Sequence, residues 1–272
     1  MIILRFFLIL LSFWLFPCQQ NAKKHKDFVI CTWNIGHFSK GKKHYSLIRK
    51  DDYKRQLDLY RSFIFNELCP DLLAVNEYNY LFCEEDNEGD DFVTSSLLFD
   101  NFKKGVIGSH EKGICNAIFS NVKIKKHRFV KFEGHKKIEG DDEIKTRDNY
   151  FIESDLYISG KKIKLVCLHL LFSNNVKEVI QQSQMEELIN RYSRIDRVIM
   201  CGDWNTGIYT SLKNAGYALA NDGSLKTYPS SGYALDNIAV KGLYVSDVRM
   251  VKTELSDHYP LVCRITMKKY VL

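Results

Sequence analysis

The string "ELSDHYPLVCRI" (254–265) joins a charged pair, Asp257-His258, to an apolar run near the C-terminus. The run has the length and composition of a buried strand, so the acid and the imidazole lie at its mouth. Taken alone, this arrangement is typical of a polar turn that happens to contain a histidine. The rest of the chain decides between that interpretation and a functional site.

Five other apolar runs also carry polar side chains at one end. These side chains are Asn34, Glu77, His169, Asp203 with Asn205, and Asp236. Each run is apolar enough to be buried, and burying such groups without partners costs several kcal/mol each, in order of magnitude. We therefore expect the strand ends to converge on one polar site.

The residue types at these ends favour one kind of chemistry. Carboxylate and amide oxygens suit a hard divalent cation such as Mg²⁺. Histidine adds acid–base capacity near neutral pH. The chain has no Gly-x-Ser-x-Gly elbow and no cysteine beside a histidine in a nucleophile-like setting, so a covalent route has little support. The pattern predicts metal-assisted attack of water on a phosphate ester.

Six strings resemble, in this order, the motifs of the endonuclease/exonuclease/phosphatase superfamily: "TWNIG", "LLAVNEY", "CLHL", "CGDWNT", "LDNIAV" and "LSDHYPLV". That superfamily includes deoxyribonuclease I, neutral sphingomyelinases and inositol polyphosphate 5-phosphatases. The resemblance extends over residues 27–267. It implies an α/β fold, a four-layer α-β-β-α sandwich of two mixed, mostly antiparallel sheets flanked by helices, with the site at one edge of the sheets.

The resemblance also implies roles for individual residues. It implies three ligands for Mg²⁺, which Mn²⁺ could replace: Glu77, Asn34 and Asp257. Asp203 would orient or deprotonate the attacking water. His258 would act as general base or as a phosphate-stabilising cation, and Asp236 would hold it in one tautomer. Which of Asp203 and His258 takes the proton stays open.

The remaining roles concern the substrate. Asn205 would hydrogen-bond a phosphate oxygen, and His169 would contact the phosphate or assist the leaving group; Asn116 is a further substrate-binding candidate. Two departures stand out. Asn76 occupies a position where many relatives have glutamine, and the string "CNAIFSN" ends in an amide where relatives often have arginine. Arg147 would supply that cation if its loop folds inward.

The first 22 residues differ in kind from the rest. One early cation, Arg5, precedes an apolar run that is shorter than the roughly 20 residues needed to span a bilayer. We interpret residues 1–22 as an export signal and residues 23–272 as a single domain. Cleavage after Ala22, lipidation of Cys18 and an uncleaved membrane anchor stay open. The expected location is periplasmic, secreted or lipid-anchored at the cell envelope.

Composition sets looser bounds. The chain of 272 residues is 45% hydrophobic, which suffices for a well-buried core, and its net charge of +6 is compatible with an anionic substrate. The basic strand predicted over 123–132 is either a solvated sheet face or a contact for a phosphate-rich partner. Four cysteines inside strand-like runs are expected to be buried core thiols: Cys31, Cys167, Cys201 and Cys263.

Local patterns predict the main helices and one hairpin. Helical periodicity covers 51–68 and 174–192, a shorter helix is expected over 210–217, and Ser159-Gly160 is typical of a hairpin turn. The last two strands are expected within 234–240 and 259–267.

Substrate identity stays open at this level. A nuclease, a phospholipid-headgroup hydrolase and an inositol- or sugar-phosphate phosphatase all fit the pattern, as a monomer without a stable protein partner. A non-catalytic binding module on the same scaffold is the rival, and it would be expected to have lost some of the site residues. The loops over 78–112 and 133–149 carry no recognisable substrate signature.

Overall fold

The structure is a computed structural model, and it describes residues 27–38, 50–79, 91–92, 101–108, 114–133, 149–172 and 179–267. The expected export signal, with Cys18, and Arg147 lie outside these ranges. No helix within them is long and apolar enough to cross a bilayer.

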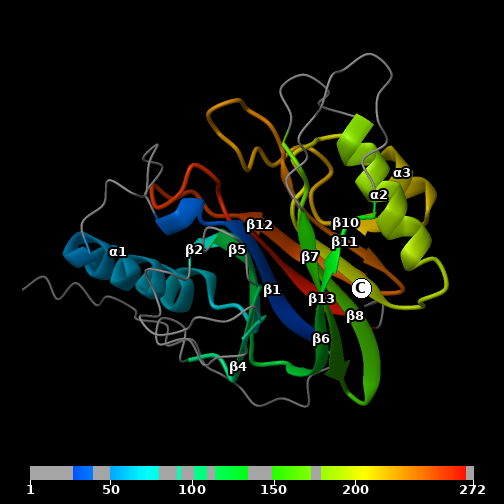
Figure 1. Ribbon diagram of the computed structural model, residues 1–272, viewed down its shortest axis with the longest axis horizontal. Coiled ribbons are helices and arrows are strands. Elements are labelled where there is room, and N and C mark those ends of the chain that lie inside the picture. The colour runs from blue at the N-terminus through cyan, green and yellow to red at the C-terminus, as the bar shows by residue number, and fades with distance from the viewer. Residues whose placement is uncertain are drawn as a thin grey trace, which may run out of the picture.

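Two stacked sheets form the centre of the molecule (Figure 1). In the described residues the first sheet has seven strands, in the order β12 (Tyr244–Met250), β13 (Leu261–Thr266), β1 (Asp27–Asn34), β2 (Leu72–Asn79), β5 (Ile114–Ser120), β4 (Lys104–Gly108) and β3 (Asp91–Phe92). The second has six, in the order β10 (Ala218–Leu219), β11 (Asp236–Lys241), β9 (Val198–Asp203), β8 (Lys161–His169), β7 (Tyr150–Ile158) and β6 (Lys123–Lys131). Two pairs, β1·β2 and β8·β9, are parallel, and the other pairs are antiparallel.

Alternation along the strands builds the layers. In β1, Phe28 and Ile30 point into the core between the two sheets, whereas Cys31 and Trp33 point to the outer face of the first sheet. Strands β8 and β9 of the second sheet supply Leu165 and other apolar side chains to the same inter-sheet core. The sheets therefore pack face to face as in a β-sandwich.

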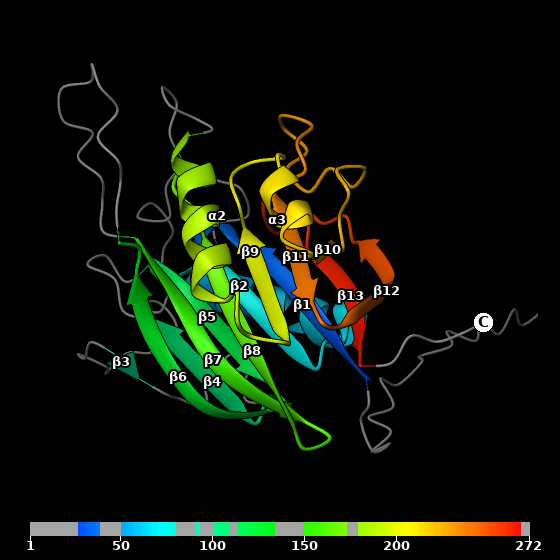
Figure 2. The same cartoon turned by 90° about the vertical axis from the view of Figure 1, so that its right-hand side faces the viewer.

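Helices cover both outer faces (Figures 1 and 2). α1 (Lys50–Phe63) continues into a π-helical turn (Ile64–Leu68) and buries Tyr60 against the first sheet. α2 (Val179–Arg191) and α3 (Thr210–Asn214) bury apolar side chains against the second sheet. The predicted four-layer sandwich of two mixed, mostly antiparallel sheets is thus confirmed.

Within the described residues the predicted helices and strands agree with these bounds to within a few residues, but four strands were not predicted: β3, β4, β10 and β12. Ser159 and Gly160 form the two-residue turn between β7 and β8, both with positive φ (49° and 75°), as expected. β12 was not predicted, because its side chains are exposed or half-buried and form no apolar run. β4 lies inside the stretch 78–112 that was expected to be loop; it is five residues long.

The four strand cysteines are buried free thiols, as expected. They are Cys31, Cys167, Cys201 and Cys263. Burial raises the pKa of the Cys167 thiol to about 12, so this thiol stays protonated and unreactive in the folded protein.

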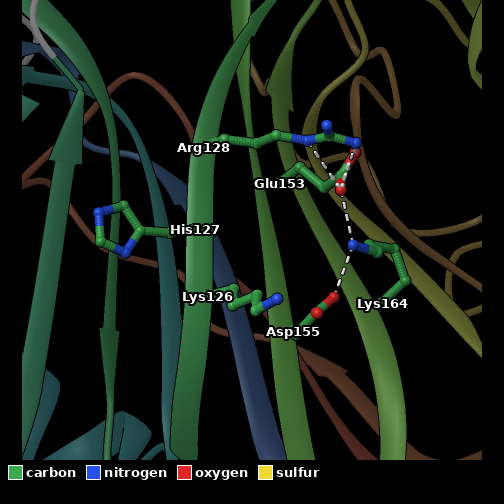
Figure 3. Close-up of a pocket in the computed structure, with 6 residues that line it drawn as sticks. All are labelled: Lys126, His127, Arg128, Glu153, Asp155 and Lys164. Atoms are coloured by element: carbon green, nitrogen blue, oxygen red, sulfur yellow. Dashed lines mark hydrogen bonds and ion pairs between the residues drawn. The ribbon is translucent and has the colours of Figure 1, made fainter.

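The outer face of β6, β7 and β8 carries a network of ion pairs (Figure 3). We call it the ion-pair cluster; its members are Arg128, Glu153, Asp155, Lys162 and Lys164. Lys164 Nζ lies 2.6 Å from Glu153 Oε1 and 2.6 Å from Asp155 Oδ1. Arg128 donates two hydrogen bonds of 3.1 Å to Glu153, and the Tyr192 hydroxyl adds one of 2.8 Å. The charge of Arg128, in the basic strand, is therefore matched inside the protein.

Candidate active site

The topology brings the predicted polar strand ends to one edge of the sandwich. β1 and β2 are parallel and end there, as do β8 and β9. β13 runs antiparallel to β1 and β11 antiparallel to β9, so both begin at that edge. In this register Asp203 lies opposite His169 on one side and opposite Asp236 on the other.

Asp203 lies at the centre of the site and is 1% exposed. Its Oδ2 accepts a hydrogen bond of 3.0 Å from Asn34 Nδ2, across the two sheets. The same oxygen lies 3.5 Å from His169 Nε2 and 3.7 Å from His258 Nε2. Its Oδ1 accepts the backbone N–H of Asn205 at 2.9 Å. One carboxylate thus contacts four other predicted site residues.

His258 is held on both sides. Its Nδ1 lies 2.8 Å from Asp236 Oδ2, which leaves Nε2 facing Asp203. The Tyr228 ring packs against the imidazole at 4.7 Å between centroids, and Trp33 Nε1 donates to the His258 carbonyl at 3.0 Å. Burial alone would lower the pKa of His258, but the carboxylates of Asp236 and Asp203 outweigh it and raise the pKa to about 10.

Glu77 emerges from a β-bulge. The register of β2 against β5 shifts between Val75 and Tyr78, and Glu77 has φ of 54°. The bulge re-aims the side chain toward the site edge. Its Oε1 accepts from Asn34 Nδ2 at 3.1 Å, and its Oε2 lies 3.0 Å from His37 Nε2. Burial would raise the pKa of Glu77, but these partners lower it to about 2, so the carboxylate is ionised at neutral pH.

A left-handed turn follows β1 and brings His37 back to Glu77. Gly36 and His37 have φ of 55°, and Phe38 has φ of 60°. Such conformations cost non-glycine residues about 1 to 3 kcal/mol each and are common at functional sites. His37 was not singled out from the sequence, because nothing in the string "NIGHF" shows that the chain reverses there.

Asp257 is exposed beside this turn. A Cβ on Gly36 would lie 3.3 Å from Asp257 Oδ1, so glycine leaves room for the carboxylate. Ser256 Oγ ties the segment to β1 through the Asn34 carbonyl at 2.7 Å, and it accepts the His258 N–H at 3.2 Å. The segment 254–258 is thereby fixed against the end of β1.

The predicted cation ligands Glu77, Asn34 and Asp257 are residue types that suit a hard divalent cation. Glu77 is ionised and Asp257 is exposed, whereas Asn34 turns its Nδ2 toward Glu77 and accepts the Gly36 N–H with its Oδ1. A second group, Asp203, Asp236 and His258, places its ligand atoms within 4.8 Å of one another. The hydrogen bond between His258 and Asp236 accounts for their approach without a cation. The ligand role of Glu77, Asn34 and Asp257 stays a prediction.

Comparison with known proteins gives a consistent result in structure and none in sequence. No protein-family model and no curated protein matches the chain. An endonuclease/exonuclease/phosphatase from Bacteroides vulgatus superposes over 89% of this chain and 99% of its own, with a TM-score of 0.64 and 13% identity. For one from Beutenbergia cavernae the shares are 89% and 72%, with a TM-score of 0.62 and 15% identity.

D. rerio TDP2, complexed with single strand DNA product, superposes over 89% of this chain and 100% of its own, with a TM-score of 0.58 and 14% identity. The chain has the endonuclease/exonuclease/phosphatase fold. The fold predicted from the six motifs is confirmed, and those predicted site residues that the structure describes lie at one edge of its two sheets.

Two residues expected to bind substrate in this endonuclease/exonuclease/phosphatase fold are engaged with the protein itself. Asn205 has φ of 50°, and its Nδ2 donates to the Leu170 carbonyl at 2.7 Å. Asn116 donates to the Tyr150 carbonyl at 3.0 Å and accepts from Asn76 Nδ2 at 2.8 Å. In contrast, the His169 side chain is 28% exposed and accessible to a ligand. The roles of all three stay predictions.

Proposed function

We propose that the protein hydrolyses phosphate esters by metal-assisted attack of water. The observation that carries the proposal is one continuous chain of contacts across both sheets. It runs from Asp236 through His258, Asp203 and Asn34 to Glu77, with successive polar atoms 2.8, 3.7, 3.0 and 3.1 Å apart. His258 and Asp203 thus lie in the same chain of contacts as Glu77, the predicted cation ligand.

The two parts of this chain would have separate roles in the reaction. Glu77, Asn34 and Asp257 would hold Mg²⁺ or Mn²⁺, which when bound supplies neutralisation of the phosphate charge. Asp203 is the group placed to take the proton of the attacking water. His258, whose raised pKa keeps it protonated at neutral pH, is placed to stabilise the phosphate charge, and Asp236 fixes the imidazole. His169, half-buried near Asp203, is placed to contact the phosphate or the leaving group.

A nucleic-acid phosphodiester is our first candidate substrate. The solved structure of D. rerio TDP2, which shares the fold, contains a single strand DNA product. The net charge of +6 also suits a polyanion. Phospholipid headgroups and inositol or sugar phosphates are the alternatives that the test must separate.

The test is a substrate panel with the purified protein and Mg²⁺. Plasmid DNA, a single-stranded oligonucleotide, sphingomyelin and a set of phosphomonoesters would each be incubated with and without EDTA. We expect hydrolysis of one class, lost in EDTA and restored by excess Mg²⁺ or Mn²⁺. Hydrolysis that ignores EDTA would contradict the metal role. Binding of a phosphate ester without turnover of any substrate would favour the binding-module alternative.

We also propose that residues 1–22 direct export and that the mature protein is a monomer at the cell envelope or outside it. Support comes from the apolar leader with its single early cation. Cell fractionation would locate the protein, and its intact mass would distinguish cleavage after Ala22 from lipidation of Cys18 and from an uncleaved anchor. Light scattering would give the oligomeric state.

A further inference from the structure

The Asn76 side chain links the two sheets at the site edge. It is fully buried, at 0% exposure, and every one of its polar groups has a partner. Its Nδ2 donates to the Leu168 carbonyl at 2.7 Å and to Asn116 Oδ1 at 2.8 Å. Its Oδ1 accepts the backbone N–H of Asp203 at 2.8 Å. The first sheet thus contacts β8 and β9 of the second through one amide.

The amide lies beside the ladder of the parallel strands β8 and β9. In the β8·β9 register Leu168 lies opposite Gly202, and His169 lies opposite Asp203. With that register the Leu168 carbonyl and the Asp203 N–H are adjacent ladder groups. Both also hydrogen-bond to Asn76, which ties this step of the ladder to the first sheet.

Gly202 makes this arrangement sterically feasible. It has φ of +145°, and a Cβ there would collide with the Leu168 carbonyl oxygen and lie 3.2 Å from Asn76 Oδ1. No other residue leaves the backbone this free at such a close approach. The space for the Asn76 amide is therefore built into β9 immediately before Asp203.

We propose that Asn76 is a positioning residue, which sets Asp203 and His169 relative to Glu77. The inference rests on the proposed phosphoesterase function. Asn76 and Glu77 are consecutive in the bulge of β2, so the predicted metal ligand and the inter-sheet link share one short piece of backbone. The apolar core between the sheets is non-directional and fixes their spacing less sharply than hydrogen bonds do.

Removing the amide should displace Asp203. In Asn76→Leu the Leu168 carbonyl and the Asp203 N–H lose their shared partner in the first sheet. Asp203 is then no longer tied to β2, so its side chain can move away from Asn34, whose Nδ2 now lies 3.0 Å from Asp203 Oδ2. Misplaced supporting residues of this kind typically cost about 10- to 100-fold in activity.

The test compares kcat and KM of three variants with the wild type. Asn76→Leu is expected to lower kcat by about 10- to 100-fold with a smaller change in KM. Asn76→Gln retains the amide and is expected to recover most of the lost kcat. Ile163→Ala is the matched control, because it opens a cavity in the inter-sheet core at the far end of β8. It should lower thermal stability while kcat stays within about twofold.

A crystal structure of the metal-free Asn76→Leu variant provides a readout that needs no activity. We expect the end of β9 at Asp203 to shift relative to β2 and the Asn34–Asp203 hydrogen bond to break. Unchanged positions of Asp203 and Asn34, or kcat within twofold of wild type, would overturn the inference. So would an equal loss of kcat in Ile163→Ala.

The two proposals can fail separately. If the wild type hydrolyses no substrate, the proposed function fails, and the crystal structure still decides the role of Asn76. If Asn76→Leu does not fold, Asn76→Gln carries the test: wild-type kcat together with a displaced amide that no longer reaches Asp203 would overturn the inference.

Discussion

Two regions of the second sheet bury carboxylates, and they satisfy them in opposite ways. In the ion-pair cluster, Glu153 and Asp155 are each 4% exposed and are paired with lysine and arginine, which carry permanent charges. At the site edge, the buried acids Asp203 and Asp236 contact histidine and asparagine instead. Acids with fixed counter-charges are committed to the fold, whereas Asp203 and Asp236 lie among the amides and imidazoles of the site edge.

Protonation equilibria show what the two regions share. Burial would raise the pKa values of Glu153 and Asp155, but hydrogen bonds from the neighbouring cations outweigh it and lower both. At the site, burial would lower the pKa of His258, and the surrounding acids raise it. Both regions therefore stabilise ionised side chains, the cluster with lysine and arginine and the site with an imidazolium beside two acids.

The largest expected effect is on catalysis. Asp203→Asn and His258→Ala should each lower kcat about 1,000-fold or more, because a positioned acid–base group contributes about 10²- to 10⁴-fold. Asp203→Asn should change the melting temperature little because it also removes a buried charge, whereas His258→Ala should lower it because the buried Asp236 loses its imidazole partner. Steady-state kinetics and thermal melts check both. Near-wild-type turnover in both variants would contradict the catalytic roles of Asp203 and His258.

The second effect is on stability. Glu153→Gln leaves Arg128 without its acid and takes one of two acids from Lys164, so it should lower the free energy of unfolding by about 3 kcal/mol. Activity should stay within twofold. Arg128→Lys is the matched control: its side chain is 64% exposed, so losing the two-point contact should cost less than about 1 kcal/mol. Chemical denaturation of the three proteins tests this ranking, and equal stabilities would contradict it.

The smallest effect is on the pH dependence of stability. Glu153 and Asp155 have folded pKa values below their unfolded values of about 4.3 and 3.9. Their contribution is therefore complete above those unfolded values and is lost as pH falls through the folded ones. Between pH 5 and pH 4 the loss should be below about 1 kcal/mol. Urea unfolding from pH 7 to pH 3 should show the difference between wild type and Glu153→Gln narrowing; parallel curves would mean the ion pairs contribute nothing.

The polar residues at the strand ends could be predicted from the sequence because they depend on short local patterns. An apolar run that ends in Asp203 or begins after His258 shows where a buried strand stops, whatever its partners are. The resemblance of six such strings, in order, to the endonuclease/exonuclease/phosphatase superfamily then implied the sandwich and the site at one edge of its sheets. The roles assigned to these residues remain predictions, since contacts alone do not measure catalysis.

The features of the site that could not be predicted from the sequence depend on contacts between separate segments of the chain. Tyr228 stacks on His258, and Trp33 bonds to its carbonyl 225 residues away, yet both residues look like ordinary core or loop aromatics in the sequence. Asn76 stood out as a departure from relatives, but its three partners come from other strands. His37 reaches Glu77 through a turn in a conformation that histidine rarely adopts.

The pairing of β13 with β1 has a consequence for the order of folding. It places a strand over Leu261–Thr266 against one that begins at Asp27, and three of the site contacts join residues 169 to 225 positions apart. Contacts of such long sequence separation carry the largest loop-closure cost and form late. A nascent chain therefore has the individual polar residues long before it has a site. Asp203 and Asn34 meet once the sheets have closed, and His258 is fixed as β13 docks, so catalytic competence arises with the last long-range step of folding.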